Sequence, residues 1–205
     1  MQNRSAFSLI ELSIVLIIVG LLIGGIIAGQ KMISLARLTS ARTLTNSSPV
    51  NVIEDLVLWL ETTSKKSFDK SEMIDEATVT TWYDINPQST VKFNATGANN
   101  PVYLKDKMGG LPGIFCSGTA KFGLGNVLDP AEDFTIYLVN LKDSTSTTSW
   151  ILQLAVGNVY IFRNNGATIR SILGGIQTNS PSTQIGNPHI VSIIHDTSQT
   201  STPPT

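Results

Sequence analysis

The chain has 205 residues, a formal net charge of −1 at pH 7 and sixteen glycines. This length suits one helical arm followed by one globular domain of about 155 residues. The near-neutral charge, without a basic patch, argues against nucleic acid as a partner. The only cysteine, Cys116, excludes an intramolecular disulfide, and we expect it to be a small buried hydrophobic residue.

The first element is an almost wholly apolar stretch from Ala6 to Gly29. At about 1.5 Å per residue, a helix over residues 7–29 is long enough to cross a hydrocarbon core of about 30 Å. Its one charge is Glu11, and a carboxylate at the bilayer centre costs about 2.5–3.5 kcal/mol. The pattern therefore indicates either an opposite charge that meets Glu11, or a plain membrane anchor whose Glu11 lies near the headgroups.

The residues around Glu11 carry a motif. A polar leader, residues 1–6, contains Arg4 and ends at the small residue Ala6, and Phe7-Ser8-Leu9-Ile10-Glu11 follows. This order resembles the N-terminal segment of type IV prepilins and type II secretion pseudopilins, although that family usually has Gly at the Ala6 position and Thr at the Ser8 position.

The resemblance implies a processing and assembly route. A prepilin peptidase would cut between Ala6 and Phe7, and the new amine of Phe7 would be N-methylated. Glu11 would then meet the N-terminal amine of a neighbouring pilin or pseudopilin subunit, which offsets the cost of burying its carboxylate. The implied location is the bacterial inner membrane, with a periplasmic C-terminal domain, and later a pilus or pseudopilus at the cell surface.

Two features bear on this interpretation. Gly20 and Gly24, like Gly25 and Gly29, are four residues apart, a spacing that allows close helix packing in lipid. Cations also follow the span, namely Lys31, Arg37 and Arg42, and counting them would place the C-terminal side in the cytoplasm. We give the prepilin-like motif more weight than this count.

The helix is expected to continue past the membrane. Apolar residues lie largely on one side of the segment that follows Gly29, and turn formers from Asn46 to Pro49 end it. The predicted organisation is a leader at 1–6, a helix at 7–48 and a β domain at 49–205.

Short apolar runs separated by polar turns predict an antiparallel β-sandwich, and hence an α+β chain. Two-residue and Asn-rich turns predict hairpins at Gly157-Asn158 and at Asn164-Asn165-Gly166. The expected strands are Leu56–Leu60, Thr78–Trp82, Val102–Leu104, Ile114–Cys116, Phe134–Leu141, Trp150–Val156, Val159–Arg163, Thr168–Leu173 and His189–His195.

Several motifs in this part resemble the laminin-G/concanavalin A-like jelly-roll family. They are Leu56-Val57-Leu58-Trp59-Leu60-Glu61, Trp82-Tyr83-Asp84, Pro101-Val102-Tyr103, Gly110-Leu111-Pro112 before Phe115, and Asp133-Phe134-Thr135-Ile136. The resemblance implies that Trp59 and Trp82 are core residues. The chain departs from the family at Ile85–Ser89 and Phe115–Gly118, and it has few residues after His195. We therefore expect a sandwich that is incomplete at its C-terminus or closes with fewer strands.

The β domain offers weak candidates for chemistry. His189 and His195 are expected at the ends of one strand, without an acid and nucleophile pattern. Asp129, Glu132 and Asp133 could hold calcium through their carboxylates, but a short acidic turn that caps the next strand is the favoured interpretation. Tyr83, Tyr103 and Trp150 could form an exposed platform for sugars. We expect no catalytic residue, no metal site and no cofactor.

The sequence thus predicts a pilin-like or pseudopilin-like subunit that assembles through its helix and displays a β-sandwich. One alternative is a minor-pilin adhesin that binds glycans or protein surfaces. Another is a simple membrane-anchored surface domain.

Overall fold

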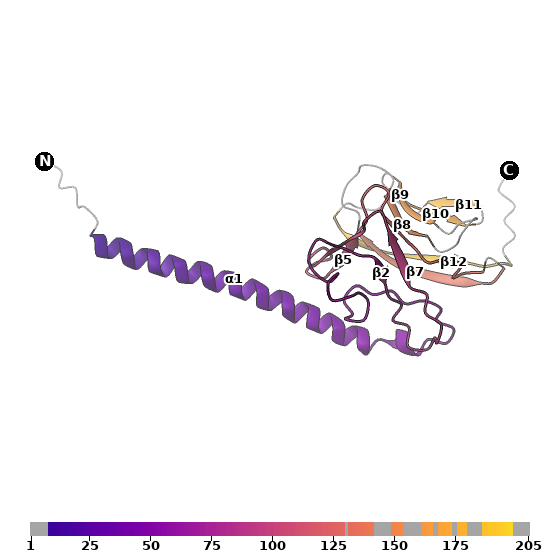
Figure 1. Ribbon diagram of the computed structural model, residues 1–205, viewed down its shortest axis with the longest axis horizontal. Coiled ribbons are helices and arrows are strands. Elements are labelled where there is room, and N and C mark those ends of the chain that lie inside the picture. The colour runs from indigo at the N-terminus through magenta and orange to yellow at the C-terminus, as the bar shows by residue number, and fades with distance from the viewer. Residues whose placement is uncertain are drawn as a thin grey trace.

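The computed structural model describes residues 8–129, 131–141, 149–153, 161–165, 168–173, 176–179 and 186–198. It has one long helix that projects from a β domain, so the N-terminal end of the helix lies far from the sheets (Figure 1). The predicted α+β arrangement is confirmed. A jelly-roll topology remains a prediction.

The helix α1 runs over Leu9–Asn46, 38 residues, or about 57 Å at 1.5 Å per residue. Ser8 precedes it in an extended conformation, with φ −68° and ψ 141°. The helix ends where expected, because Asn46, Ser47 and Ser48 are followed by Pro49. Pro49 then begins a short 3₁₀ helix, Pro49–Val52, in which its missing N–H costs nothing.

The strands form three sheets. β1 (Ala77–Thr78), β4 (Val102–Leu104) and β5 (Gly113–Phe115) make a three-stranded sheet in the order β1-β4-β5. A seven-stranded sheet has the order β11-β10-β9-β8-β6-β3-β2, and β7 and β12 form a pair of their own. The remaining bounds are β2 Thr81–Trp82, β3 Ala95–Ala98, β6 Lys121–Gly123, β7 Phe134–Leu141, β8 Ser149–Gln153, β9 Ile161–Asn165, β10 Thr168–Leu173, β11 Ile176–Asn179 and β12 Pro188–His195.

All described pairings are antiparallel except one, because β6 and β8 run parallel. The pairing of β9 with β10 confirms the hairpin expected around Asn164-Asn165-Gly166, of which Asn164 and Asn165 belong to β9. The expected turn at Gly157-Asn158 lies outside the described residues, although the strands on either side, β8 and β9, do pair.

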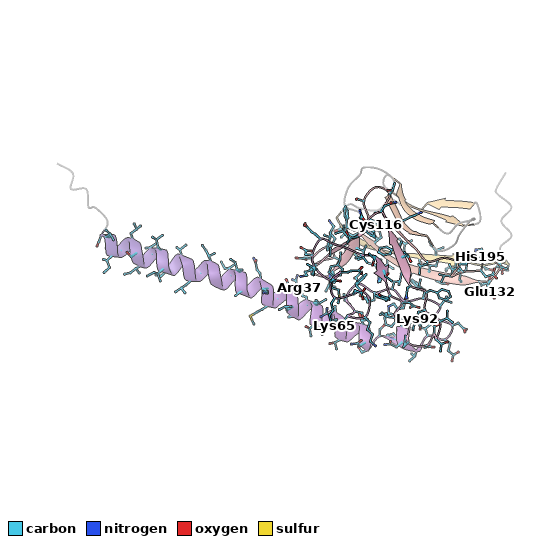
Figure 2. All side chains as sticks on the ribbon, in the orientation of Figure 1. Arg37, Lys65, Lys92, Cys116, Glu132 and His195 are labelled. Carbon is cyan, nitrogen blue, oxygen red and sulfur yellow. The ribbon has the colours of Figure 1, made fainter. Side chains whose placement is uncertain are left out.

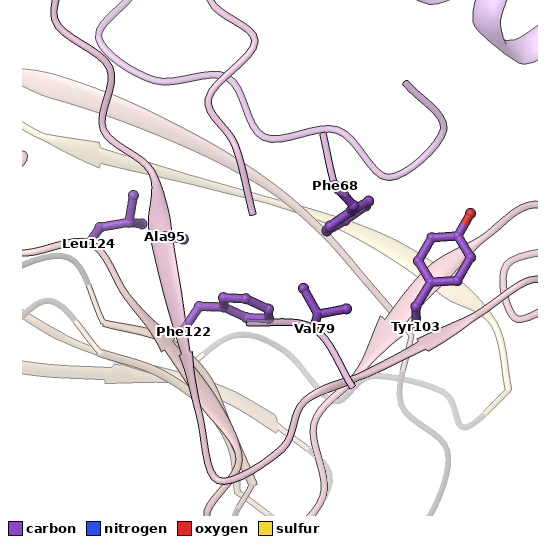
Figure 3. Packing of buried hydrophobic residues seen from close by; sticks show 6 residues of the cluster. All are labelled: Phe68, Val79, Ala95, Tyr103, Phe122 and Leu124. Atoms are coloured by element: carbon purple, nitrogen blue, oxygen red, sulfur yellow. The ribbon is translucent and has the colours of Figure 1, made fainter. Parts of the chain in front are cut away.

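The core of the domain lies where the sheets face one another, and Figure 3 shows its six buried hydrophobic residues. These are Phe68, Val79, Ala95, Tyr103, Phe122 and Leu124. Trp82 packs on this cluster with its ring edge-on to Phe122, at 5.5 Å between centroids. The inner faces of β7 and β12 cover the cluster from another side through Ile136, Leu138 and Ile193.

The strand predicted over Leu56–Leu60 is wrong, because this segment joins no sheet. Leu58 and Leu60 do pack on the core, whereas Trp59 is half-buried and outside the set that packs there. Side chains of the following segment take the place of a ladder. The N–H of Trp59 donates to the Asp84 carboxylate at 3.0 Å, and the Asn86 amide donates to the carbonyl of Leu56.

Asp84 is the centre of this arrangement and is 6 % exposed. Its Oδ1 accepts the N–H groups of Trp59 and of Asn86, at 3.0 and 2.9 Å, and its Oδ2 accepts that of Phe93 at 3.4 Å. One buried carboxylate therefore holds three backbone segments together through hydrogen bonds.

The strand predicted over Thr78–Trp82 is divided between two sheets. Its ends become β1 and β2, while Val79 between them is buried and donates its N–H to the carbonyl of Pro101 at 2.8 Å. Glu72 fixes the break, since its Oε1 accepts the N–H of Thr80 at 2.9 Å. A carboxylate on a separate turn thus supplies the partner that a continuous ladder would have supplied.

Adding one methyl group at Gly97 in β3 is expected to destabilise the domain. A Cβ at this position would lie 2.3 Å from the carbonyl oxygen of Val79 and 3.0 Å from the Pro101 ring. Because the backbone must move to relieve this clash, Gly97→Ala is expected to lower the free energy of unfolding by about 1–3 kcal/mol. Gly123 in the adjacent strand β6 is the matched control, because no atom of the described residues lies within 4 Å of its added Cβ.

Thermal unfolding of the full chain in detergent, followed by circular dichroism, measures the difference between the two variants. Gly97→Ala should melt several degrees below Gly123→Ala. Equal melting temperatures would contradict the close approach of Val79 to Gly97.

The β7 and β12 pair is apolar on both faces. The inner faces pack on the core, but Tyr137, Ile190 and Ile194 on the outer face are each 75 % exposed. Val139 on the same face is directly opposite Ile190. At one end of the pair, the Asp133 carboxylate accepts the N–H and the hydroxyl of Thr197, both at 2.7 Å, and these bonds lower the pKa of Asp133.

Candidate functional site

The N-terminal end of α1 carries the candidate assembly residue. Glu11 Oε2 accepts the backbone N–H of Ser8 at 2.9 Å, so the carboxylate folds back over the start of its own helix. A negative charge is favourable at this end, where the helix dipole and unpaired N–H groups are positive. Ala6 and Phe7, between which cleavage is expected, lie outside the described residues. A new amine on Phe7 would belong to the residue next to Ser8.

The surface of α1 is apolar and uncovered. None of its residues is buried, and it is long and apolar enough to cross a membrane, with a mean hydropathy of 2.8 over its most apolar window. The polar side chain of Ser13 is satisfied within the helix, because its hydroxyl donates to the carbonyl of Leu9 at 2.7 Å. Such internal bonding is what a hydrocarbon environment requires.

The four glycines of the span leave open space on this surface. Within the part of the chain that the structure describes, no atom lies within 4 Å of a Cβ added at Gly20, Gly24, Gly25 or Gly29. Their missing side chains therefore leave room for no contact seen among these residues. A neighbouring helix could approach closely along them.

The C-terminal turns of α1 dock on the β domain. Leu38, Ala41, Arg42 and Thr45 are the half-buried residues there, and their spacing places them on one face of the helix. Arg42 Nε donates to the carbonyl of Thr63 at 2.8 Å. Arg37 lies against Gly110, since a Cβ at Gly110 would be 2.8 Å from Arg37 Nη1 (Figure 2 labels Arg37 on the helix).

This junction is the part of the site that the sequence did not indicate. In the sequence, Arg37 and Arg42 are only charges that follow a candidate membrane span, whereas in the structure Arg42 donates to the carbonyl of Thr63 and Arg37 lies against Gly110. The signal that could have revealed them is the spacing of Leu38, Ala41 and Thr45 around Arg42, which marks a half-buried face of the helix that is less apolar than its N-terminal part.

The candidates for chemistry in the β domain stay apart. His189 and His195 lie on one face of β12, as the even spacing predicted, and His195 stacks on Phe134 at 4.7 Å between ring centroids. Asp129 Oδ1 accepts the N–H of Ala131 at 2.8 Å within a local turn. Asp133 instead binds Thr197, which follows β12, so its carboxylate joins the start of β7 to the end of β12. Among the described residues no three His, Cys, Asp or Glu side chains are grouped as metal ligands would be.

The sugar platform is not assembled as expected. Tyr103 is a core residue, only 3 % exposed, so its prediction as an exposed ring is wrong. Tyr83 is half-buried with its hydroxyl 3.4 Å from both carboxylate oxygens of Asp69, and the negative charge of Asp69 raises the pKa of Tyr83. The side chain of Trp150 lies outside the described residues.

Cys116 is half-buried and packs against the core cluster. Burial raises the pKa of its thiol to about 11. The side chain therefore stays protonated at neutral pH, as expected for a packing residue and not for a nucleophile.

Comparison with known families finds one match, to the prokaryotic N-terminal methylation motif, over residues 1–27. Comparisons with curated proteins and with solved structures find no match. The matched segment includes the leader, the expected cleavage position and Glu11, and it ends inside α1. It supports a precursor of the type IV pilin or pseudopilin kind, which implies processing by a prepilin peptidase and assembly with other pilins. The β domain lies outside it.

Proposed function

We propose that this chain is the precursor of a type IV pilin-like or pseudopilin-like subunit. It is cut between Ala6 and Phe7, assembled through α1 and displays residues 49–205 as a β-sandwich domain outside the membrane. The observation that carries the proposal is the coincidence of two features. The methylation motif at residues 1–27 overlaps a helix of which the structure buries no residue.

The exposed apolar surface of α1 must be covered by lipid before assembly and by other helices after it. Before assembly, residues 7–29 are covered by lipid, which accepts apolar side chains and requires every backbone group to be bonded within the helix. After assembly, neighbouring helices replace the lipid, and the open glycine positions from Gly20 to Gly29 allow them to approach closely. A core helix of a soluble domain would instead be buried within its own chain.

Glu11 sets where a neighbouring subunit binds in this assembly. Its carboxylate already binds the N–H of Ser8, so it is held at the end of the helix where cleavage creates a positive amine. A neighbouring subunit that brings such an amine to Glu11 offsets the cost of a carboxylate in hydrocarbon. A helix without this partner retains that cost.

The cations after the span fit an exported domain once the junction is taken into account. Arg37 and Arg42 contact the domain through Gly110 and Thr63, so their place in the sequence serves docking. Their number is therefore a poor guide to topology here. The proposed orientation has the leader in the cytoplasm and the β domain on the opposite side.

Processing at Ala6 gives the direct test of the proposal. When the precursor is expressed with an active prepilin peptidase, intact-protein mass spectrometry should show loss of residues 1–6 and a methylated Phe7. Ala6→Leu is expected to abolish cleavage, because the peptidase subsite takes a small residue. Asn3→Leu, in the leader but away from the expected bond, is the control and should be cut normally.

The contradicting result is a chain that keeps Met1 in the presence of the active peptidase. Such a chain would be a membrane-anchored domain and not a subunit of this kind.

A further inference from the structure

A pocket lies where the last turns of α1 meet the segment just before Phe68, the first residue of the core cluster. It has a volume of about 280 Å³ and is lined by Arg42, Thr45, Asn46, Ser64, Lys65 and Lys66. Figure 2 labels Lys65 beside the C-terminal half of the helix. The pocket thus belongs to the helix–domain junction and not to the assembly end of the helix.

The charge of this pocket has one sign. Three of its six lining residues are cations and none is an acid. Two acids are equally close along the chain, Glu61 and Asp69. Glu61 Oε1 accepts the N–H of Thr63 at 3.0 Å and the Thr63 hydroxyl at 2.8 Å, and the Asp69 carboxylate faces the Tyr83 hydroxyl at 3.4 Å. The cations of the pocket are therefore not compensated by a lining carboxylate.

The C-terminal end of α1 does not neutralise the positive charge of the pocket either. The carbonyls of Thr43 and Thr45 accept the N–H groups of Ser47 and Ser48, at 3.0 and 3.2 Å, and the carbonyl of Asn46 accepts the Asn51 amide at 2.8 Å. The dipole of the helix adds about half a negative charge at this end. Three positive charges exceed that several-fold, so the pocket stays positive.

Arg42 is held ready to bind an anion. Its Nε is fixed to the carbonyl of Thr63, which is a buried residue, so the guanidinium keeps one orientation. The terminal nitrogens of such a fork match the oxygens of a phosphate group. Ser64 Oγ accepts the N–H of Lys66 at 3.2 Å, which leaves the hydroxyl proton of Ser64 to be donated to a ligand.

We propose that this pocket binds the phosphate group of a ligand, with Arg42, Lys65 and Lys66 supplying the charge and Ser64 a hydroxyl donor. Its volume is just below the range of about 300–1,000 Å³ found for drug-sized ligands, so it suits a single small oxyanion group. This proposal does not depend on cleavage or assembly.

Distance separates two sources of that phosphate. Arg42 is thirteen residues beyond Gly29, or about 20 Å along the helix axis. The headgroup layer on one side of a bilayer is only about 5–8 Å thick. A soluble phosphate ester therefore reaches the pocket, and the headgroups of the membrane that holds α1 do not.

The test follows the backbone amide signals of the ¹⁵N-labelled full chain in uncharged detergent micelles. Inorganic phosphate and then glycerol 3-phosphate are expected to shift the amides of Thr45, Asn46 and Ser64–Lys66 in a saturable manner. The double variant Lys65→Gln/Lys66→Gln is expected to weaken binding about tenfold or more, because it removes two charge-assisted contacts. Both side chains are exposed, so the unbound spectrum should show a folded domain.

The matched control is Lys70→Gln/Lys105→Gln, which removes the same charge from exposed positions outside the pocket and should change the affinity less than twofold. Three results would overturn the proposal. They are the absence of saturable shifts, equal shifts with chloride at the same ionic strength, and an equal loss of affinity in the control variant. Shifts that occur in nanodiscs containing phosphatidylglycerol, but not with either soluble probe, would overturn the soluble source.

Discussion

Replacing Asp84 with alanine is expected to lower the free energy of unfolding of the β domain by about 3–5 kcal/mol. The carboxylate is buried and accepts three backbone N–H groups, from Trp59, Asn86 and Phe93. Alanine leaves these donors without partners in a place that water does not reach. The segment Leu56–Leu60, which has no ladder of its own, then loses an anchor to the core.

The measurement is thermal unfolding of the full chain in detergent, where the midpoint should fall by about 10 °C. Asp84→Asn keeps one oxygen acceptor and should lose less than Asp84→Ala. Asp106→Ala is the control, because Asp106 is an exposed acid in the β4–β5 loop. If Asp84→Ala melts within two degrees of the unaltered protein, Asp84 does not hold these segments together.

Replacing Glu11 with glutamine is expected to leave processing intact and to reduce incorporation into filaments at least about tenfold. An amide oxygen can still accept the N–H of Ser8, so the start of α1 is preserved. The negative charge that would meet the amine of a neighbour is lost, and a tenfold effect corresponds to about 1.4 kcal/mol per contact. Glu11→Leu removes both interactions and should reduce incorporation further.

The readout is the amount of processed subunit in sheared filaments relative to the membrane fraction. Ser13→Ala is the matched control two residues away, since the Ser13 hydroxyl bonds only within the helix in the described structure. It should assemble normally. Normal assembly of Glu11→Gln, with normal cleavage, would show that the charge has no role between subunits and would return Glu11 to the capping of its own helix.

Elements defined by their own residues were predicted well. The helix follows from an unbroken apolar run with turn formers after it, and it ends at Asn46. Strands β7 and β10 have the predicted bounds, Phe134–Leu141 and Thr168–Leu173, because long runs of β-branched and aromatic residues mark them. Glu11 was chosen as a candidate because it is one acid in an apolar segment and belongs to the prepilin-like motif, and its role in assembly stays a prediction.

Elements defined by distant partners were not predicted. Strands β3, β6 and β11 were missed, since their sequences ATGA, KFG and IQTN contain few apolar residues and depend on their neighbours in the sheet. Leu56–Leu60 has the composition of a strand, but Asp84, more than twenty residues later, satisfies part of its backbone instead. The parallel pairing of β6 with β8 leaves no local signal.

The junction between α1 and the β domain was not predicted for the same reason, because it depends on residues that are distant in the sequence. Lys65 and Lys66 carry no local sign of a binding site, and only the docking of α1 brings them to Arg42.

Because α1 is one unbroken helix from its apolar part to the β domain, it fixes the angle at which the domain faces relative to that apolar part. Because the helix turns by about 100° per residue, one residue inserted between Gly29 and Leu38 would rotate the whole β domain by that angle around the axis of α1. An insertion of seven residues would restore the facing direction to within about 20° while lifting the domain by about 10 Å. The length of this segment therefore sets which surface of the domain lies on the same side as a given face of the apolar part of α1.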